Sequence, residues 1–215
     1  MQKIFKDELF STPVFKVNIL QHVNQLNQLT DPYIKDSIKR DKERIKLDKT
    51  IPKKLKNSFG SSYHSTSLIL DNNFKFFIDK IVDHSNHFIN DCGFDIQHKK
   101  ISLNELWVQE FSKLGGGHHS AHSHWNQHVS GFYFLKCSEL TSFPRFYDPR
   151  PGAVMTKLPL LDKNKISSGS ESVHYKIKPG DMIIFPGYLA HEFSVDNGIE
   201  PFRFIHWNLQ YVERN

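Results

Sequence analysis

Cysteine and long apolar runs are both scarce in this chain of 215 residues. Neither of its two cysteines, Cys92 and Cys137, belongs to a Cys-x-x-Cys pair, so we expect reduced thiols and a cytoplasmic protein. Apolar runs such as Met182–Phe185 are far too short to cross a bilayer. The first ten residues lack the apolar core of a secretion signal. We therefore expect no contact with a membrane.

The positive charge of the chain is concentrated in one stretch. Residues 35–56 hold ten Lys or Arg and four acidic residues, so their net charge is +6. Because the whole chain carries a net charge of +5, the remaining residues sum to −1. Either this stretch is a solvated helical face or it binds an anionic partner such as nucleic acid. No aromatic residue interleaves its basic residues, so a stacking platform for bases is missing. We favour the solvated face and expect no nucleic-acid partner, with the role of the stretch left open.

The first third of the chain is typical of a helical region. An apolar, partly β-branched stretch within residues 1–20 predicts a strand, residues 20–47 predict a helix broken at Pro32, and residues 48–71 predict a loop. Residues 72–91 carry apolar side chains at helical spacing, with Asp71 as the expected N-cap and Gly93 just past the end. We expect residues 1–94 to form a helical support region, with His84 and His87 structural.

The helical period disappears after Gly93. Short apolar segments separated by Gly, Pro, Asn and Asp follow, at residues 96–111, 129–137, 143–147, 172–178, 181–187, 189–195 and 202–212. Many short strands with turn residues between them predict a sandwich or barrel. The expected fold is mainly β with helices (α+β): a double-stranded β-helix, or jelly roll, over residues 95–215. With 38% hydrophobic residues and 18 Phe, residues 1–215 can bury a core as one domain.

Five of the 13 histidines fall in one window of eleven residues: His118, His119, His122, His124 and His128. Imidazole is the commonest protein ligand for transition metals. His122 and His124 are two residues apart, so in an extended strand both rings reach one ion. A third candidate, His191, lies in a strand-like stretch far downstream. We predict a metal site from these three, with the other histidines of the window as supporting, substrate-contacting or solvated groups.

The order of motifs permits a comparison with a known family. The run comprises Trp107–Phe111, Gly115–Gly117, His122 with His124, the Ser-Gly-aromatic strand 130–135, and Asp148-Pro149-Arg150-Pro151, followed by Lys178–Asp181, Phe185-Pro186, His191 and Arg203. It resembles the Fe(II)/2-oxoglutarate-dependent oxygenases, in particular the group with a His-x-His…His motif where better-known relatives have His-x-Asp. The resemblance covers roughly residues 95–210.

The resemblance implies that His122, His124 and His191 hold Fe(II) and that Arg203 binds the distal carboxylate of 2-oxoglutarate. Tyr133 is a weaker candidate contact for the same cosubstrate. The implied activity is that of a dioxygenase, a hydroxylase that couples decarboxylation of 2-oxoglutarate to C–H oxidation by O2. Three histidines leave the iron without a carboxylate ligand. Ile205 also departs from the Ser or Thr that relatives often carry two residues after the arginine.

A cupin-type metal-dependent enzyme or binding module that does not use 2-oxoglutarate is the alternative. Gly116, His122 and His124 fit the first cupin motif, and Gly180, Pro186 and His191 fit the second, with Tyr188 in place of a glycine. Because the two families have nearly the same fold, fold does not separate them. The substrate, a small molecule or a protein side chain, is not readable from the sequence. We expect that the chain can form a homodimer.

Overall fold

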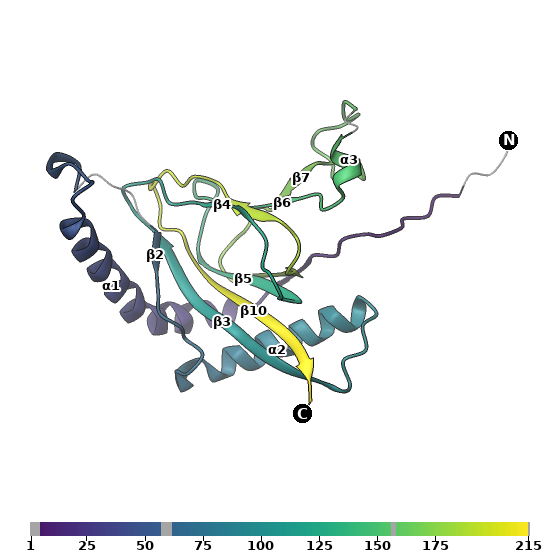
Figure 1. Ribbon diagram of the computed structural model, residues 1–215, viewed down its shortest axis with the longest axis horizontal. Helices are drawn as coiled ribbons and strands as arrows, with labels where there is room; N and C mark the ends of the chain where they lie inside the picture. The colour runs from purple at the N-terminus through teal and green to yellow at the C-terminus, as the bar shows by residue number, and fades with distance from the viewer. Residues whose placement is uncertain (1–4, 57–61, 156–157, 215) are drawn as a thin grey trace.

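The computed structural model describes residues 5–56, 62–155 and 158–214 (Figure 1). The strands are β1 (Phe15–Asn18), β2 (Ser62–His64), β3 (Lys99–Phe111), β4 (His119–His122), β5 (Val129–Lys136), β6 (Pro144–Tyr147), β7 (Ser172–His174), β8 (Asp181–Pro186), β9 (His191–Phe193) and β10 (Arg203–Glu213). The α-helices are α1 (Val23–Leu47), α2 (Lys75–Asp91) and α3 (Pro151–Met155), with short 3-10 turns at Leu20–His22, Lys53–Leu55 and Asn72–Phe74. No helix within the described ranges is long and apolar enough to cross a membrane.

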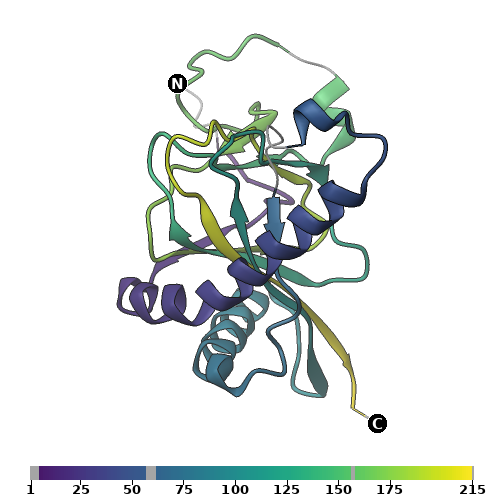
Figure 2. The same ribbon diagram turned by 90° about the vertical axis from the view of Figure 1, so that its left-hand side faces the viewer.

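Two antiparallel sheets form the body of the molecule. The large sheet has the order β1-β8-β5-β10-β3-β2, and the small sheet has the order β4-β9-β6-β7. Helices α1 and α2 lie on the face of the large sheet that is turned away from the small sheet, and Figure 2 shows α1 crossing in front of the strands. The predicted jelly roll with helices packed against it is confirmed, and each stretch expected to be a strand after Gly93 contains one.

Helix α1 corrects the expectation of a break at Pro32. Proline inside a helix removes one backbone hydrogen bond, to the carbonyl four residues earlier. Here both Pro32 and Gln28, whose carbonyl loses its donor, are exposed, so water can hydrogen-bond that oxygen. The opposite face of α1 buries Leu26, Thr30 and Ile34. Packing of that face against the sheet therefore keeps the helix continuous through the proline.

Helix α2 begins and ends where the sequence indicates. The Asp71 side chain accepts a hydrogen bond from the backbone N–H of Asn73 at the entrance to the helix. Gly93 follows the last turn with φ +82°, the left-handed conformation that commonly terminates a helix. The apolar face of α2 buries Phe77, Ile81 and Phe88 against the large sheet.

Strand β10 divides the interior into two cores. Its odd-numbered residues, such as Ile205 and Trp207, enter the helix-side core between the large sheet and the helices. Phe204 enters the inter-sheet core between the two sheets, and the even-numbered His206 shares that face. Gly131 lets the Trp207 ring approach β5, because a Cβ there would lie 2.2 Å from the ring. Which core a β10 side chain joins therefore follows from its parity along the strand.

Candidate metal centre

His122, His124 and His191, here called the histidine triad, meet at the edge of the small sheet. His122 ends β4 and pairs directly with His191 at the start of β9. His124 follows two residues later, and its backbone N–H donates to Gly187 O at 2.9 Å. One ligand nitrogen from each of the three rings lies within 4.8 Å of the other two. The structure thus brings together the three residues that the sequence predicts as metal ligands.

The hydrogen bonds of two triad rings leave one nitrogen of each aimed at a common point. The Nδ1 atoms of His122 and His191 lie 2.7 Å and 2.9 Å from the carbonyl oxygens of Ser120 and Leu189. A carbonyl only accepts, so Nδ1 carries the proton and Nε2 keeps its lone pair. The buried Nε2 atom of His191 has no hydrogen-bond partner among the described residues. Metal-binding histidines commonly have this arrangement, in which the second nitrogen donates to a carbonyl.

The third ring is oriented by Asn208 on β10. The Asn208 Nδ2 atom lies 3.1 Å from Nδ1 of His124, and the Nε2 atom of His124 is buried without a partner. The same Nδ2 atom donates to Glu105 Oε2 at 2.6 Å, so the amide nitrogen lies between the carboxylate and the ring. The donor set therefore fits a first-row transition ion such as Fe(II).

Burial keeps the imidazoles of His124 and His191 neutral near pH 7, as metal ligation requires. Desolvation is the largest cause in each case, with the neighbouring histidines adding repulsion. It lowers the pKa of His124 to about 4 and the pKa of His191 to about 3. The same causes lower the pKa of His119 to about 4. A neutral imidazole offers its lone pair without first losing a proton.

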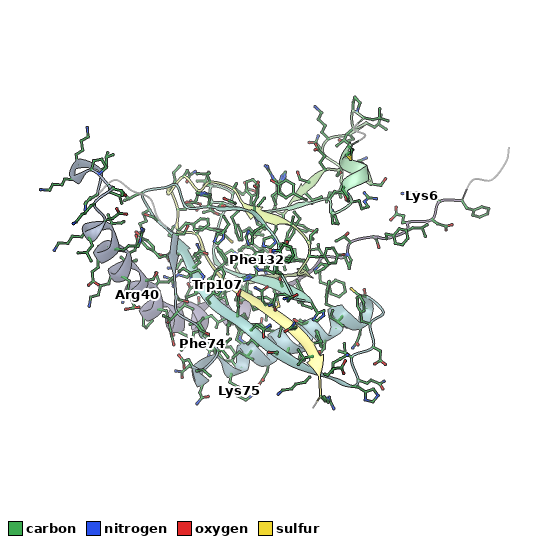
Figure 3. All side chains as sticks on the ribbon, in the orientation of Figure 1. Lys6, Arg40, Phe74, Lys75, Trp107 and Phe132 are labelled. Carbon is green, nitrogen blue, oxygen red and sulfur yellow. The ribbon has the colours of Figure 1, made fainter. Side chains whose placement is uncertain are left out.

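Aromatic side chains line the space between the sheets behind the triad. Figure 3 places Phe132 and Trp107 in the body of the molecule, in contrast to Lys6 far out on the N-terminal segment. Phe132 lies 5.4 Å from the ring centroid of His191. The buried members of the inter-sheet core are Ile183, Leu189 and eight phenylalanines: Phe111, Phe132, Phe134, Phe146, Phe185, Phe193, Phe202 and Phe204. This lining keeps water away from one side of the triad.

Arg203, the predicted cosubstrate anchor, faces the helices. Its Nη1 donates to Asp31 Oδ1 at 2.6 Å and its Nε donates to Glu110 Oε2 at 2.7 Å. Arg203 has the same parity along β10 as Ile205 and Trp207, whose side chains also lie on the helix side of the large sheet. Arg203 is also the one buried Lys or Arg side chain among the described residues. The structure therefore does not bring a buried guanidinium to the histidine triad.

Tyr133 likewise lies on the other side of the large sheet. Its hydroxyl donates to Ile19 O at 2.8 Å, and its ring packs on Phe77 of α2. Burial raises its pKa above the usual range. Odd-numbered residues of β5 face the helices, so Tyr133, the predicted cosubstrate contact, lies in the helix-side core.

The other histidines of the window differ in their surroundings. His119 lies beside His122, with ring centroids 5.8 Å apart, and its Nε2 contacts Gln109 Oε1 at 2.6 Å. His118 and His128 are exposed, and His128 Nδ1 accepts from the backbone N–H of Tyr211. His119 is thus a supporting group of the site, while His118 and His128 are surface residues.

Three polar residues that lie next to the triad are not predicted from the sequence: Glu105, His206 and Asn208. His206 is fully buried, and its ring stacks on that of His124 at 4.8 Å between centroids. Glu105, near the middle of β3, also lies close to both histidines. The alternation of Phe204, His206 and Asn208 on β10 is the sequence signal for a shared inward face, but it becomes usable only once the strand's register is known.

The family model described as "Putative 2OG-Fe(II) oxygenase" matches residues 105–201, which include the whole histidine triad. No curated protein matches the chain. A prolyl-4-hydroxylase from Pseudomonas putida has a similar fold, with a TM-score of 0.51 and 11% identity over 96% of this chain and 95% of that one.

Two further solved structures are similar to parts of the chain. An oxidoreductase of the 2OG-Fe(II) oxygenase family from Burkholderia pseudomallei gives a TM-score of 0.48 and 8% identity, covering 69% of this chain and 68% of that one. The non-heme α-ketoglutarate-dependent epimerase SnoN from nogalamycin biosynthesis gives 0.41 and 13% identity, covering 64% and 59%.

Proposed function

We propose that this chain, whose residues 105–201 match the 2OG-Fe(II) oxygenase model, is an Fe(II)- and 2-oxoglutarate-dependent dioxygenase that hydroxylates its substrate. The observation that carries the proposal is the histidine triad, whose ligand nitrogens lie within 4.8 Å of one another. Oxygenases of this kind need three protein ligands and open positions on the iron.

The residues of the chain have distinct parts in this chemistry. The histidine triad holds the ion, and the carbonyls of Ser120 and Leu189 fix two of its rings through Nδ1. The phenylalanines of the inter-sheet core exclude water from one side of the site. Fe(II), when bound, supplies the redox chemistry that couples decarboxylation of 2-oxoglutarate to oxidation by O2. The protein contributes orientation and a dry environment.

The substrate side of the site is assigned to a cleft beside β6. This cavity of about 530 Å³ is lined by Phe146, Leu189 and the Asp148-Pro149-Arg150 element, among others. The Phe146 ring separates this cavity from the triad, with its centroid 6.0 Å from that of the His191 ring. The Arg150 guanidinium is held by Asp148 through two hydrogen bonds, which gives the rim a fixed cation. We propose that a small molecule or a protein side chain with a polar group enters here.

The test is a titration of 2-oxoglutarate into anaerobic protein loaded with Fe(II). The proposal expects a metal-to-ligand charge-transfer absorbance in wild type, and succinate release once O2 is admitted. His191→Ala should abolish the band, whereas His118→Ala, on the exposed loop, should retain it. Iron that stays bound without any such band would argue against 2-oxoglutarate as cosubstrate.

One observation favours the alternative, a cupin-type metal-dependent enzyme that does not use 2-oxoglutarate. A buried dicarboxylate needs a fixed cation at its far end, because an unpaired buried charge is costly. Arg203 does not fill that place, since it pairs with Asp31 and Glu110 on the helix side. Iron-dependent O2 consumption without succinate release would support this second candidate.

A further inference from the structure

His206 is a buried polar side chain without a partner. It is 1% exposed, and neither Nδ1 nor Nε2 has a hydrogen-bond partner in the described part of the chain. Buried polar groups in proteins are nearly always satisfied, so two bare ring nitrogens on one residue call for an explanation. The nearest charged group is Glu105, whose Oε2 lies 4.0 Å from Nε2 of His206.

A second convergence of ligand atoms forms around this histidine. One ligand atom each from Glu105, His124 and His206 lies within 4.8 Å of the other two. Two histidines and one carboxylate are the donor set of many divalent iron sites, and also suit Zn(II). The carboxylate that the histidine triad lacks is therefore present one ring away.

Asn208 lies between these ligand atoms. Its Nδ2 donates to Glu105 Oε2 at 2.6 Å and lies 3.1 Å from Nδ1 of His124. An amide N–H donor of Asn208 thus lies where those two acceptors converge. With the amide turned over, Asn208 offers its oxygen there instead, and the Ser130 hydroxyl remains in reach because a hydroxyl both donates and accepts.

We propose that Glu105, His124 and His206 bind a second divalent transition-metal ion, with His124 bridging it to the ion of the histidine triad. Nε2 of His124 serves the triad, and Nδ1, on the side of Asn208 and Glu105, serves the second ion. Two metal–nitrogen bonds of about 2 Å across one ring place the ions about 6 Å apart. The bridging ring becomes an imidazolate, whose negative charge offsets the repulsion between the ions.

The position of Glu105 makes the second site accessible. Its side chain is about half exposed, whereas His206 is buried, so the ion would be taken from solvent at Glu105 and held inside by the ring. This proposal rests on the proposed function only in sharing His124. The two can therefore fail separately.

The test is metal stoichiometry. Metal-free protein is incubated with excess Zn(II), passed through gel filtration, and analysed for bound zinc per chain. Wild type should retain two equivalents. Glu105→Gln and His206→Phe should each retain one, and the retained ion shows that the barrel is still folded. His122→Ala should also lose one, and His124→Ala should lose both. His118→Gln, an exposed histidine of the same window, should keep two.

Each remaining outcome has a definite meaning. One equivalent in wild type, unchanged in Glu105→Gln and His206→Phe, overturns the second site and leaves the proposed function standing. One equivalent that is lost in His206→Phe and kept in His122→Ala overturns the second ion and also the triad as the iron site. Two equivalents in both Glu105→Gln and His206→Phe show that the second ion lies elsewhere, which overturns this inference.

Discussion

His122 and His191 are cross-strand partners on β4 and β9, with their ring centroids 4.5 Å apart. Residues 69 positions apart in the chain are thereby fixed by one backbone pairing. In antiparallel sheets, directly opposite side chains lie on the same face and in contact. The register of the small sheet therefore fixes two members of the histidine triad, while the third, His124, lies just beyond the end of β4.

Removing one of these partners should remove the metal. His191→Ala is expected to weaken iron retention by more than the roughly 10–100-fold that loss of an outer hydrogen-bond partner typically causes. Iron per chain after gel filtration is the measurement. His128→Ala is the control, because that exposed residue lies outside the triad. Full occupancy in His191→Ala together with loss in His128→Ala would move the site into the histidine window alone.

Patterns local in sequence were sufficient for much of this fold. The spacing of Phe77, Ile81 and Phe88, with Asp71 before them, predicts α2 because a helix end is decided by nearby hydrogen bonds. The close spacing of His122 and His124 likewise predicts that their rings share a site, and the structure brings a nitrogen of each within 4.8 Å of one from His191.

What the sequence could not show depends on tertiary context. The continuity of α1 depends on the sheet beneath it, which overrides the local effect of Pro32. The face of Arg203 depends on which set of alternate β10 residues is turned toward the helices, and only the folded sheet decides that. His206 has no neighbour in sequence that marks it as a ligand. It becomes a candidate ligand only through its proximity to Glu105, which lies on the adjacent strand β3.

Neutralising the basic stretch should leave the chemistry unchanged. Lys39, Lys42, Lys46 and Lys49 are all exposed, on α1 or just beyond its end, away from the inter-sheet core. Changing all four to Gln should keep uncoupled turnover of 2-oxoglutarate within a few-fold of wild type, because solvated charges contribute little at a distance. A collapse of turnover with an unchanged circular dichroism spectrum would show that this stretch shapes the site. Salt-dependent retention of nucleic acid by wild type, but not by the Gln variant, would support the binding of an anionic partner to this stretch.

Metal-free protein should lose stability as the pH falls. An unfolded histidine takes up a proton near pH 6.5, but the folded protein holds the pKa of His124 at about 4 and of His191 at about 3. Between those values the unfolded chain binds more protons, so the free energy of unfolding falls as the pH drops from about 6.5 towards 4. Each such histidine contributes a slope of up to about 1.4 kcal/mol per pH unit.

Urea unfolding at several pH values between 7 and 5 measures this slope. His206→Phe should make it shallower, because burial also lowers the pKa of His206 well below its ordinary value. A free energy of unfolding that stays flat over this range in wild type would mean that these rings are not buried and neutral.

Replacing Arg203 should lower the stability of the protein and leave the metal centre unchanged. Its guanidinium is buried and binds Asp31 of α1 and Glu110 of β3 at once, so it ties the helix to the large sheet. Removing one partner of a buried ion pair commonly costs about 3–5 kcal/mol. Because Asp31 is about half exposed, Arg203→Met should fall near the lower end of that range, at about 3 kcal/mol in urea unfolding.

The pH dependence of stability provides a second test of the contact between Arg203 and Asp31. The hydrogen bond from Arg203 holds the pKa of Asp31 below its ordinary value of 3.8. A lowered carboxyl pKa gives stability that is present above about pH 4 and is lost as the pH falls through the lowered value. Arg203→Met should remove that acid-side dependence while iron binding and the affinity for 2-oxoglutarate stay as in wild type. If Arg203→Met instead abolished the charge-transfer band of the Fe(II)–2-oxoglutarate complex in protein that remains folded, the arginine would reach the cosubstrate after all, and the helix-side assignment of its guanidinium would be wrong.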